Sequence, residues 1–172
     1  MTGIGGINVT LQLCGVTLSL MIILCLYFGG NVKTRTSRLY VLLLVCNMCG
    51  MLFDALAYVF RGKEGFVASV GVRASNFLAF CSFCVFPTIL LSYLNQFVSA
   101  KKAGVCRPYL MLSWGVCALY LVLYVVNLFV PIFYYIDASN VYMRTPLYGL
   151  TMIPAFWNML LTVIILIKHR DT

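Results

Sequence analysis

The stretch LYVLLLVCNMCGMLFDALAYVF, residues 39–60, is apolar along almost its whole length and contains one carboxylate, Asp54. A helix needs about 20 apolar residues to cross about 30 Å of hydrocarbon. This stretch therefore predicts a transmembrane helix. Four further stretches have the same character, so that five helices are expected, over about residues 7–28, 39–60, 75–98, 109–130 and 147–167.

The five stretches predict helices rather than strands. Membrane-spanning strands alternate apolar and polar residues over roughly 10 positions, whereas these stretches are longer and do not alternate. The expected fold is an all-α, multi-pass transmembrane bundle. The gaps between the stretches are short, so residues 1–172 are expected to form a single transmembrane domain.

The composition supports a membrane protein. Of the 172 residues, 63% are hydrophobic and only 9% are charged, whereas soluble domains have about 25% charged residues. The net charge of +8 falls in the gaps between the apolar stretches and forms no single patch. Nucleic-acid binding is therefore not expected, and the expected location is the cell membrane, with lipid as the main surroundings.

The distribution of basic residues predicts the orientation. Eight Lys and Arg residues lie in the first gap, the third gap and the C-terminal tail, and four lie in the second and fourth gaps. Basic residues are enriched on the cytoplasmic side of membrane proteins. The N-terminus is therefore predicted to face outwards and the C-terminus inwards.

Asp54 lies about 9 Å below the outer end of its predicted helix, at the helical rise of about 1.5 Å per residue. Asn47 and Arg61 are each seven residues away and share its face, with the small residues Gly50 and Ala57 between them. Small and polar residues on one face predict contact with other helices rather than with lipid.

Other stretches place polar residues at a similar depth. Two interpretations remain open: these residues join helices, or they line an outward-facing site for a ligand or a proton, since ionisable groups inside membranes are often functional. The candidate sensing residues are Asp54, Asn47, Gln12, Asn76 and Asn127, with Arg61 and Arg73 as counter-charges.

Two proline residues and two cysteine pairs require an explanation. Pro87 and Pro154 are predicted inside transmembrane stretches, where proline bends a helix, so each is either a hinge or a static packing feature.

The pairs Cys46–Cys49 and Cys81–Cys84 have the spacing of zinc ligands. Because structural zinc pairs usually lie on turns, and cysteine is also an ordinary small apolar residue, neither a metal nor a cofactor is expected.

The aromatic residues of the fourth gap and its flanks also allow two interpretations. They form either an interfacial belt or a surface that faces a ligand. These residues are Phe129, Phe133, Tyr134, Tyr135, Tyr142 and Tyr148.

The motifs LQLCG (residues 11–15), KTRTSRLYVLLL (33–44) and LFDALA (52–57) carry a resemblance to a known family. Together they resemble the N-terminal membrane region of GGDEF-type diguanylate cyclases and related sensor proteins of Gram-positive anaerobic bacteria. The acid of LFDALA, which recurs in that pattern, is Asp54 here. The resemblance implies a sensory input region that precedes a cytoplasmic diguanylate cyclase domain.

The expected function is therefore a membrane-embedded sensory module that works as a homodimer and binds an unidentified extracellular or membrane-borne small ligand. No G-G-[DE]-E-F motif and no hydrolase or metalloprotease motif is present, so no enzyme activity is expected within these residues. Two alternatives remain: a small transporter or channel, and a structural subunit of a membrane assembly.

Overall fold

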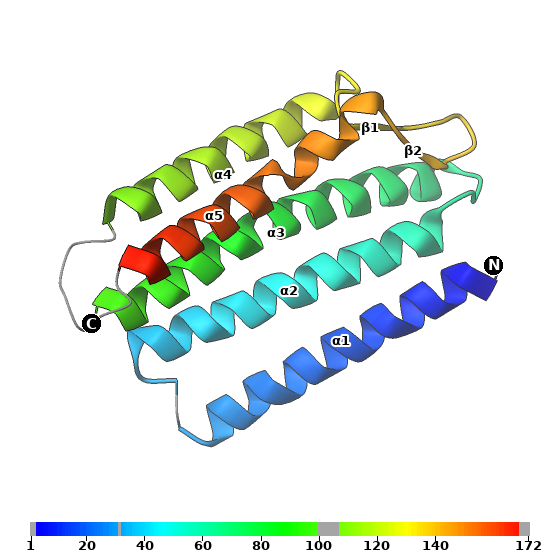
Figure 1. Cartoon of the computed structure of the whole chain (residues 1–172). Helices are drawn as coiled ribbons and strands as arrows, with labels where there is room; N and C mark the ends of the chain where they lie inside the picture. Colours follow the sequence, from blue (N-terminus) through cyan, green and yellow to red (C-terminus); the bar gives the residue numbers. More distant parts are fainter. Residues whose placement is uncertain (1–2, 31, 100–106, 169–172) are drawn as a thin grey trace.

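The chain forms a bundle of long helices in a computed structural model that describes residues 3–30, 32–99 and 107–168 (Figure 1). In these residues, five helical segments are long and apolar enough to cross a membrane, as predicted. The expected all-α class is confirmed, and the chain is a multi-pass membrane protein. The elements are α1 (Gly3–Phe28), α2 (Arg35–Phe60), α3 (Phe66–Ser99), α4 (Arg107–Asn127), β1 (Tyr134–Ile136), β2 (Tyr142–Arg144), the 3-10 helix η1 (Pro146–Met152) and α5 (Ile153–Lys168).

The observed boundaries differ by up to four residues for α1, α2 and α4, and more clearly in two places. Helix α3 begins at Phe66 rather than near Ser75, so Arg73 lies within a helix and not in a loop. The last membrane-spanning segment is divided into η1 and α5. Lys101, Lys102 and Arg170, which contribute to the predicted orientation, lie outside the described residues.

A small hairpin that the hydropathy pattern does not predict lies between α4 and η1. Strands β1 and β2 are antiparallel, and Tyr135 pairs with Met143. The aromatic side chains in these strands favour extended backbone. The carboxylate of Asp137 closes the turn by accepting hydrogen bonds from the backbone N–H groups of Ser139 (2.9 Å) and Val141 (2.8 Å).

The helices lie side by side, with α3 in the centre of the bundle (Figure 1). Helix α2 packs against one side of α3, and α4 and α5 pack against the rest of it. Helix α1 lies at the edge and packs mainly against α2. The N-terminal part of α1 lies at the same end of the bundle as the β-hairpin (Figure 1). We call this end, marked by residues 61–65 and 134–144, the hairpin end.

The tip of the hairpin is attached to the turn between α2 and α3. The backbone N–H of Gly62 donates to the carbonyl oxygen of Asn140 at 3.0 Å, and the side chain of Asn140 donates to the carbonyl oxygen of Lys63 at 2.8 Å. Asn140 has a φ of 56°, which asparagine tolerates better than most residues. These bonds hold the hairpin against the end of α2.

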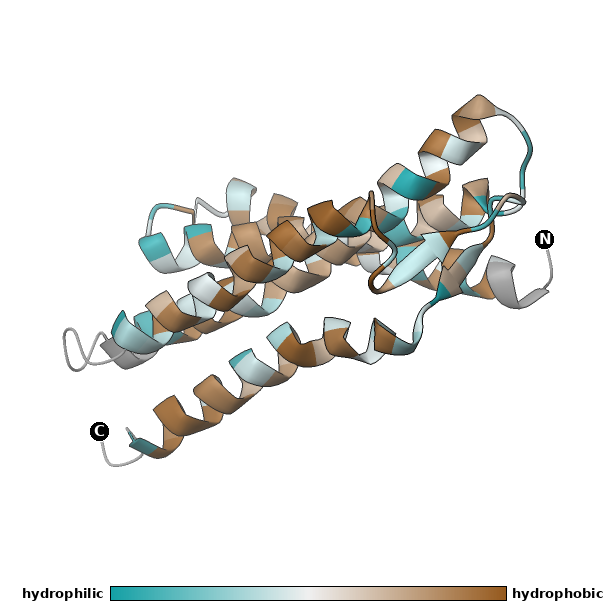
Figure 2. Ribbon diagram, turned by 90° about the horizontal axis from the view of Figure 1, so that it is seen from above, coloured by the Kyte–Doolittle hydropathy of each residue, from teal (hydrophilic) through white to brown (hydrophobic). Residues whose placement is uncertain are grey.

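Hydrophobic residues make up most of the length of the helices, and hydrophilic residues are more frequent towards the ends (Figure 2). Large hydrophobic residues such as Leu11 on α1 and Val122 on α4 are exposed, at 65% and 60% of their surface. In a membrane this surface faces lipid, so its exposure costs nothing.

The interface between α2 and α3 depends on small residues, as the sequence predicts. Gly50 and Ala57 are both buried. A Cβ atom added at Gly50 would lie 3.0 Å from Cε1 of Phe83, so glycine allows the two helices to approach closely. This close packing places the polar residues of α2 beside those of α3.

Candidate functional site

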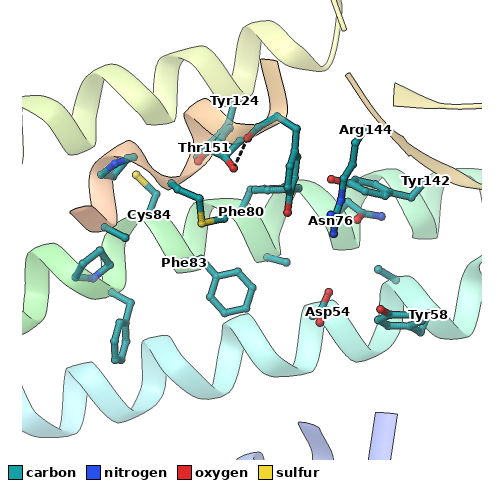
Figure 3. Close-up of a pocket in the computed structure, with 18 of the residues that line it drawn as sticks. Asp54, Tyr58, Asn76, Phe80, Phe83, Cys84, Tyr124, Tyr142, Arg144 and Thr151 are labelled. Carbon is teal, nitrogen blue, oxygen red and sulfur yellow. Dashed lines mark hydrogen bonds between the residues drawn. The ribbon is translucent and has the colours of Figure 1, made fainter. Parts of the chain in front are cut away.

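A pocket of about 900 Å³ lies between α2, α3, β2, η1 and α5 towards the hairpin end (Figure 3). This volume is within the usual range for small-molecule sites, about 300–1,000 Å³. The polar residues of its lining are Asp54, Tyr58, Arg61, Asn76, Tyr124 of α4, Tyr142, Arg144, Tyr148 and Thr151. The rest of the lining is mainly apolar, and includes Phe80, Phe83, Phe86, Pro87, Met152 and Ala155.

Three of the predicted sensing residues, Asp54, Arg61 and Asn76, line this pocket. Figure 3 shows Asp54 and Tyr58 on α2, opposite Asn76 on α3 and Arg144, which extends from β2 towards Asn76. Asn76 also donates to the carbonyl oxygen of Val72 at 2.7 Å, which fixes its side chain. The structure thus brings the acid of α2 and the amide of α3 to one site, and adds Arg144 to them.

Gln12 lies outside the lining but bonds to it. Its Nε2 donates a hydrogen bond to Oδ2 of Asp54, across the interface between α1 and α2. One turn further towards the hairpin end, Nδ2 of Asn8 donates to the hydroxyl oxygen of Tyr58 at 3.3 Å. Two side chains of the pocket therefore anchor α1.

Asn8 and Tyr58 are not among the residues predicted from the sequence, although their spacing contains a signal. Asn8 precedes Gln12 by four residues and Tyr58 follows Asp54 by four, so each pair shares a helix face. Antiparallel helices that pair Gln12 with Asp54 must also bring Asn8 near Tyr58. Pairing the two polar faces would have predicted both bonds.

Besides Gln12, three predicted sensing residues lie outside the pocket lining. Asn47 is half-buried on α2, and its one recorded contact is a weak hydrogen bond to the sulfur of Met51 at 3.9 Å. Arg73 is exposed on α3. Asn127 is buried and has a structural position at the end of α4.

Asn127 holds the start of the hairpin against α4. Its Oδ1 accepts hydrogen bonds from the backbone N–H groups of Ile132 (2.9 Å) and Phe133 (2.7 Å), and its Nδ2 donates to the carbonyl oxygen of Tyr134 (3.2 Å). The amide thus satisfies backbone groups that would otherwise be buried without partners. Its depth predicts a sensing residue, but its bonds position β1 and, through β1, the strand that carries Tyr142 and Arg144.

The aromatic residues of the hairpin region are divided between packing and the pocket. Phe133 and Tyr134 are buried, and the ring of Tyr134 stacks on Phe80 with centroids 4.9 Å apart. Tyr142 and Tyr148 line the pocket. Phe129 is 81% exposed, as expected of a residue in an interfacial belt.

Two phenols of the hairpin are buried without a hydrogen-bond partner, those of Tyr134 and Tyr142. Burial raises the pKa of Tyr134 to about 12. Burial also raises the pKa of Tyr142, and the neighbouring Tyr148 makes a smaller contribution in the same direction. Both are therefore neutral hydrogen-bond donors at physiological pH. The guanidinium of Arg144 lies over the ring of Tyr148, 4.3 Å from its centroid, in a cation–π contact.

A buried polar cluster lies beyond the pocket, towards the middle of the bundle. Ser113 on α4 donates to Oδ1 of Asn158 on α5, and its Oγ lies 3.4 Å from Oγ1 of Thr88 on α3. Nδ2 of Asn158 also lies 3.4 Å from Oγ1 of Thr88. All three residues are almost completely buried. The sequence analysis did not predict this cluster, because Thr88 and Ser113 are single polar residues in apolar stretches.

The cysteine pairs do not converge on one point. Cys84 lies beside Cys117 of α4, with the sulfur atoms 4.0 Å apart, and Cys46 donates to the carbonyl oxygen of Ser82 at 3.3 Å. Within the described ranges, no group of three or more His, Cys, Asp or Glu side chains could hold a metal ion. The pairs act here as helix-packing residues.

The two proline residues differ in position. Pro87 lies inside the continuous helix α3 and lines the pocket. Pro154 is the second residue of α5, directly after η1, rather than a residue in mid-helix. Proline is tolerated in the first turn because its missing N–H would have no intrahelical partner there. A hinge role for either residue stays a prediction.

The fold and the pocket define a multi-pass membrane protein with a candidate ligand site at one end of its bundle. Comparison with protein-family models, with curated proteins and with solved structures finds no significant match. The functional inference therefore rests on the site itself.

Proposed function

We propose that this chain is a membrane-embedded sensory module that binds a small ligand in the pocket and transmits its presence through α1. The supporting observation is that Asp54 and Tyr58 belong both to the pocket lining and to the interface with α1. Both line the pocket, and both accept the hydrogen bonds that anchor α1. A ligand in the pocket thus contacts the groups that position α1.

This arrangement provides a physical route from occupancy to conformation. A ligand changes a conformational equilibrium only through different affinities for the two states. A ligand that fixes the side chains of Asp54 and Tyr58 stabilises the arrangement in which they accept bonds from Gln12 and Asn8. Because α1 packs mainly against α2, a change in these bonds can alter the position of α1 without rebuilding the rest of the bundle.

The orientation, the partner and the output of the module are part of the same proposal. The hairpin end faces outwards, in agreement with the distribution of basic residues. The module forms a homodimer in the cell membrane and regulates a cytoplasmic output of the diguanylate cyclase class. The class of the output is supported by the resemblance of residues 7–62 alone. This part of the proposal is tested by measuring the cellular concentration of cyclic dinucleotide in the Asp54→Asn variant. An unchanged concentration would contradict it.

Ligand binding is tested by filling the pocket. Ala155 is exposed and lines the pocket from α5, whereas Ala118 is exposed on α4 outside the lining. The protein is transferred directly from its native membrane into nanodiscs. We expect it to retain a small molecule that native mass spectrometry detects. The variant Ala155→Trp should lose this molecule because the indole occupies its space.

The matched variant Ala118→Trp should retain the molecule, since its indole faces lipid. The proposal fails if no molecule accompanies the wild-type protein, or if both variants retain it equally. Thermal unfolding of both variants shows whether either tryptophan disturbs the fold.

A transporter is the second candidate, and the buried cluster of Thr88, Ser113 and Asn158 favours it. The cluster extends the polar groups of the pocket towards the middle of the bundle. Uptake of the retained molecule by liposomes that contain the protein would support transport. Binding without uptake would support the sensory module.

A further inference from the structure

We infer that the ligand of this pocket is an amphipathic anion, with an oxyanion head at the hairpin end and an apolar tail along α3. This inference rests on the proposed function, because it specifies the ligand of the same pocket. The shared chemistry is a carboxylate or phosphate head joined to an extended apolar chain.

The charged groups of the pocket favour an anionic head. Arg61 at the end of α2 and Arg144 on β2 both line it, and both side chains are exposed at the hairpin end. Asp54 is the only carboxylate in the lining. Its Oδ2 already accepts a hydrogen bond from Gln12. Guanidinium groups are well suited to carboxylate and phosphate because their planar N–H groups can form two parallel hydrogen bonds.

The neutral polar groups add hydrogen-bond donors. Tyr142 lines the pocket, and its buried hydroxyl has no hydrogen-bond partner. The hydroxyl oxygen of Tyr58 accepts from Asn8, so its own hydrogen is free to donate to a ligand. A head rich in acceptor oxygens would satisfy both phenols, whereas an ammonium head has no acceptor and would satisfy neither.

The apolar part of the lining favours a tail rather than a compact ligand. From Asn76 to Pro87 the pocket extends about 16 Å along α3, at the helical rise of about 1.5 Å per residue. Phe83, Phe86 and Pro87 line its far part from α3, opposite Pro154 and Ala155 of α5. Phe83 and Ala155 are exposed although they line the pocket, so the pocket is open at this part, and a tail can enter there from the bilayer.

The depth of the polar and apolar parts matches an amphiphile in one leaflet. The arginine residues lie at the end of the bundle, where lipid head groups are expected, and the apolar lining continues towards the bilayer centre. A free inorganic anion would contact only the arginine residues and not the apolar lining. The experiment therefore compares an anion that has a tail with one that lacks it.

The test measures binding of defined probes to the full chain in phosphatidylcholine nanodiscs. The probes are oleate and oleyl phosphate as amphipathic anions, inorganic phosphate as a head without a tail, and dodecyltrimethylammonium as an amphipathic cation. We expect saturable binding of the two amphipathic anions and no comparable binding of the other two. Arg144→Gln and Arg61→Gln should each weaken binding by roughly three- to tenfold, as expected for one charge-assisted contact near water.

Arg73→Gln is the matched control, because Arg73 is an exposed arginine near the same end but outside the lining. It should leave the affinity unchanged, which separates a specific head-group site from general attraction to positive charge. Asp54→Asn should tighten binding of the anions, since it removes the one negative charge from the lining.

Three results would overturn the inference. If the cation binds more tightly than the anions, or if Arg144→Gln and Arg73→Gln have equal effects, the head group is not recognised as an anion. If inorganic phosphate binds as tightly as oleyl phosphate, the tail has no role. In each case Ala155→Trp still reports whether the molecule retained from the native membrane occupies the pocket, so failure of this inference is distinguishable from failure of the proposed function.

Discussion

Replacing Asn127 by leucine should lower the free energy of unfolding by about 2–4 kcal/mol, because it leaves buried backbone donors without an acceptor. The side-chain oxygen of Asn127 accepts from the N–H groups of Ile132 and Phe133, and both distances are below 3.0 Å. Leucine has a similar size but no acceptor. We expect the start of the hairpin to separate from α4, which would displace Tyr142 and Arg144 from the pocket.

The measurement is unfolding of the protein in mixed micelles during titration with dodecyl sulfate, together with retention of the native small molecule. Asn127→Asp, measured at a pH at which its carboxyl group is protonated, is the control, since this group keeps an acceptor oxygen and can still donate to the carbonyl oxygen of Tyr134. It should be destabilised much less than the leucine variant. Equal stability of the two variants would contradict the anchoring role of Asn127.

The second large effect is expected at Asn158. Its side chain joins α5 to Ser113 on α4 and to Thr88 on α3. Hydrogen bonds between membrane helices contribute on average about 0.6 kcal/mol and at most about 1.7 kcal/mol. Asn158→Leu removes two of them and should lower the free energy of unfolding by about 1–3 kcal/mol.

Thr162→Val provides the comparison on the same helix. The hydroxyl of Thr162 donates to the carbonyl oxygen of Asn158 within α5, and among the described residues it bonds to no other helix. This variant should change stability by less than about 1 kcal/mol, because it removes one hydrogen bond within a single helix. If Asn158→Leu were as stable as Thr162→Val, the cluster would not hold α3, α4 and α5 together.

The sequence predicts the membrane helices well because their signal is local. Each needs only a long apolar stretch such as residues 39–60, and no knowledge of neighbouring elements. The hairpin is different: Phe133 and Tyr134 are buried against residues of α3 and α4 that are distant in sequence. Hydropathy alone therefore identifies this segment as a gap and cannot predict its contacts.

The candidate site is predicted in part for the same reason. Spacing along α2 places Asp54 and Arg61 on one face, and depth places Asn76 near them. Depth also favours Asn127, whose side chain bonds the backbone at the start of the hairpin. Arg144 joins the pocket only because the hairpin folds over α3, which is a tertiary effect. Residue type and depth indicate a polar layer, but they do not separate the residues that line a pocket from those that hold the fold.

The central claim is that occupancy of the pocket controls the attachment of α1, and hydrogen–deuterium exchange of residues 6–16 tests it most directly. The comparison uses nanodiscs prepared from the native membrane, with the wild type, Ala155→Trp and Ala118→Trp. Ligand binding stabilises the state that binds it, so loss of the ligand in Ala155→Trp should increase exchange in α1, although Ala155 belongs to α5. Ala118→Trp should match the wild type. Equal exchange of residues 6–16 in Ala155→Trp and the wild type, with the ligand lost from the variant, would contradict the account.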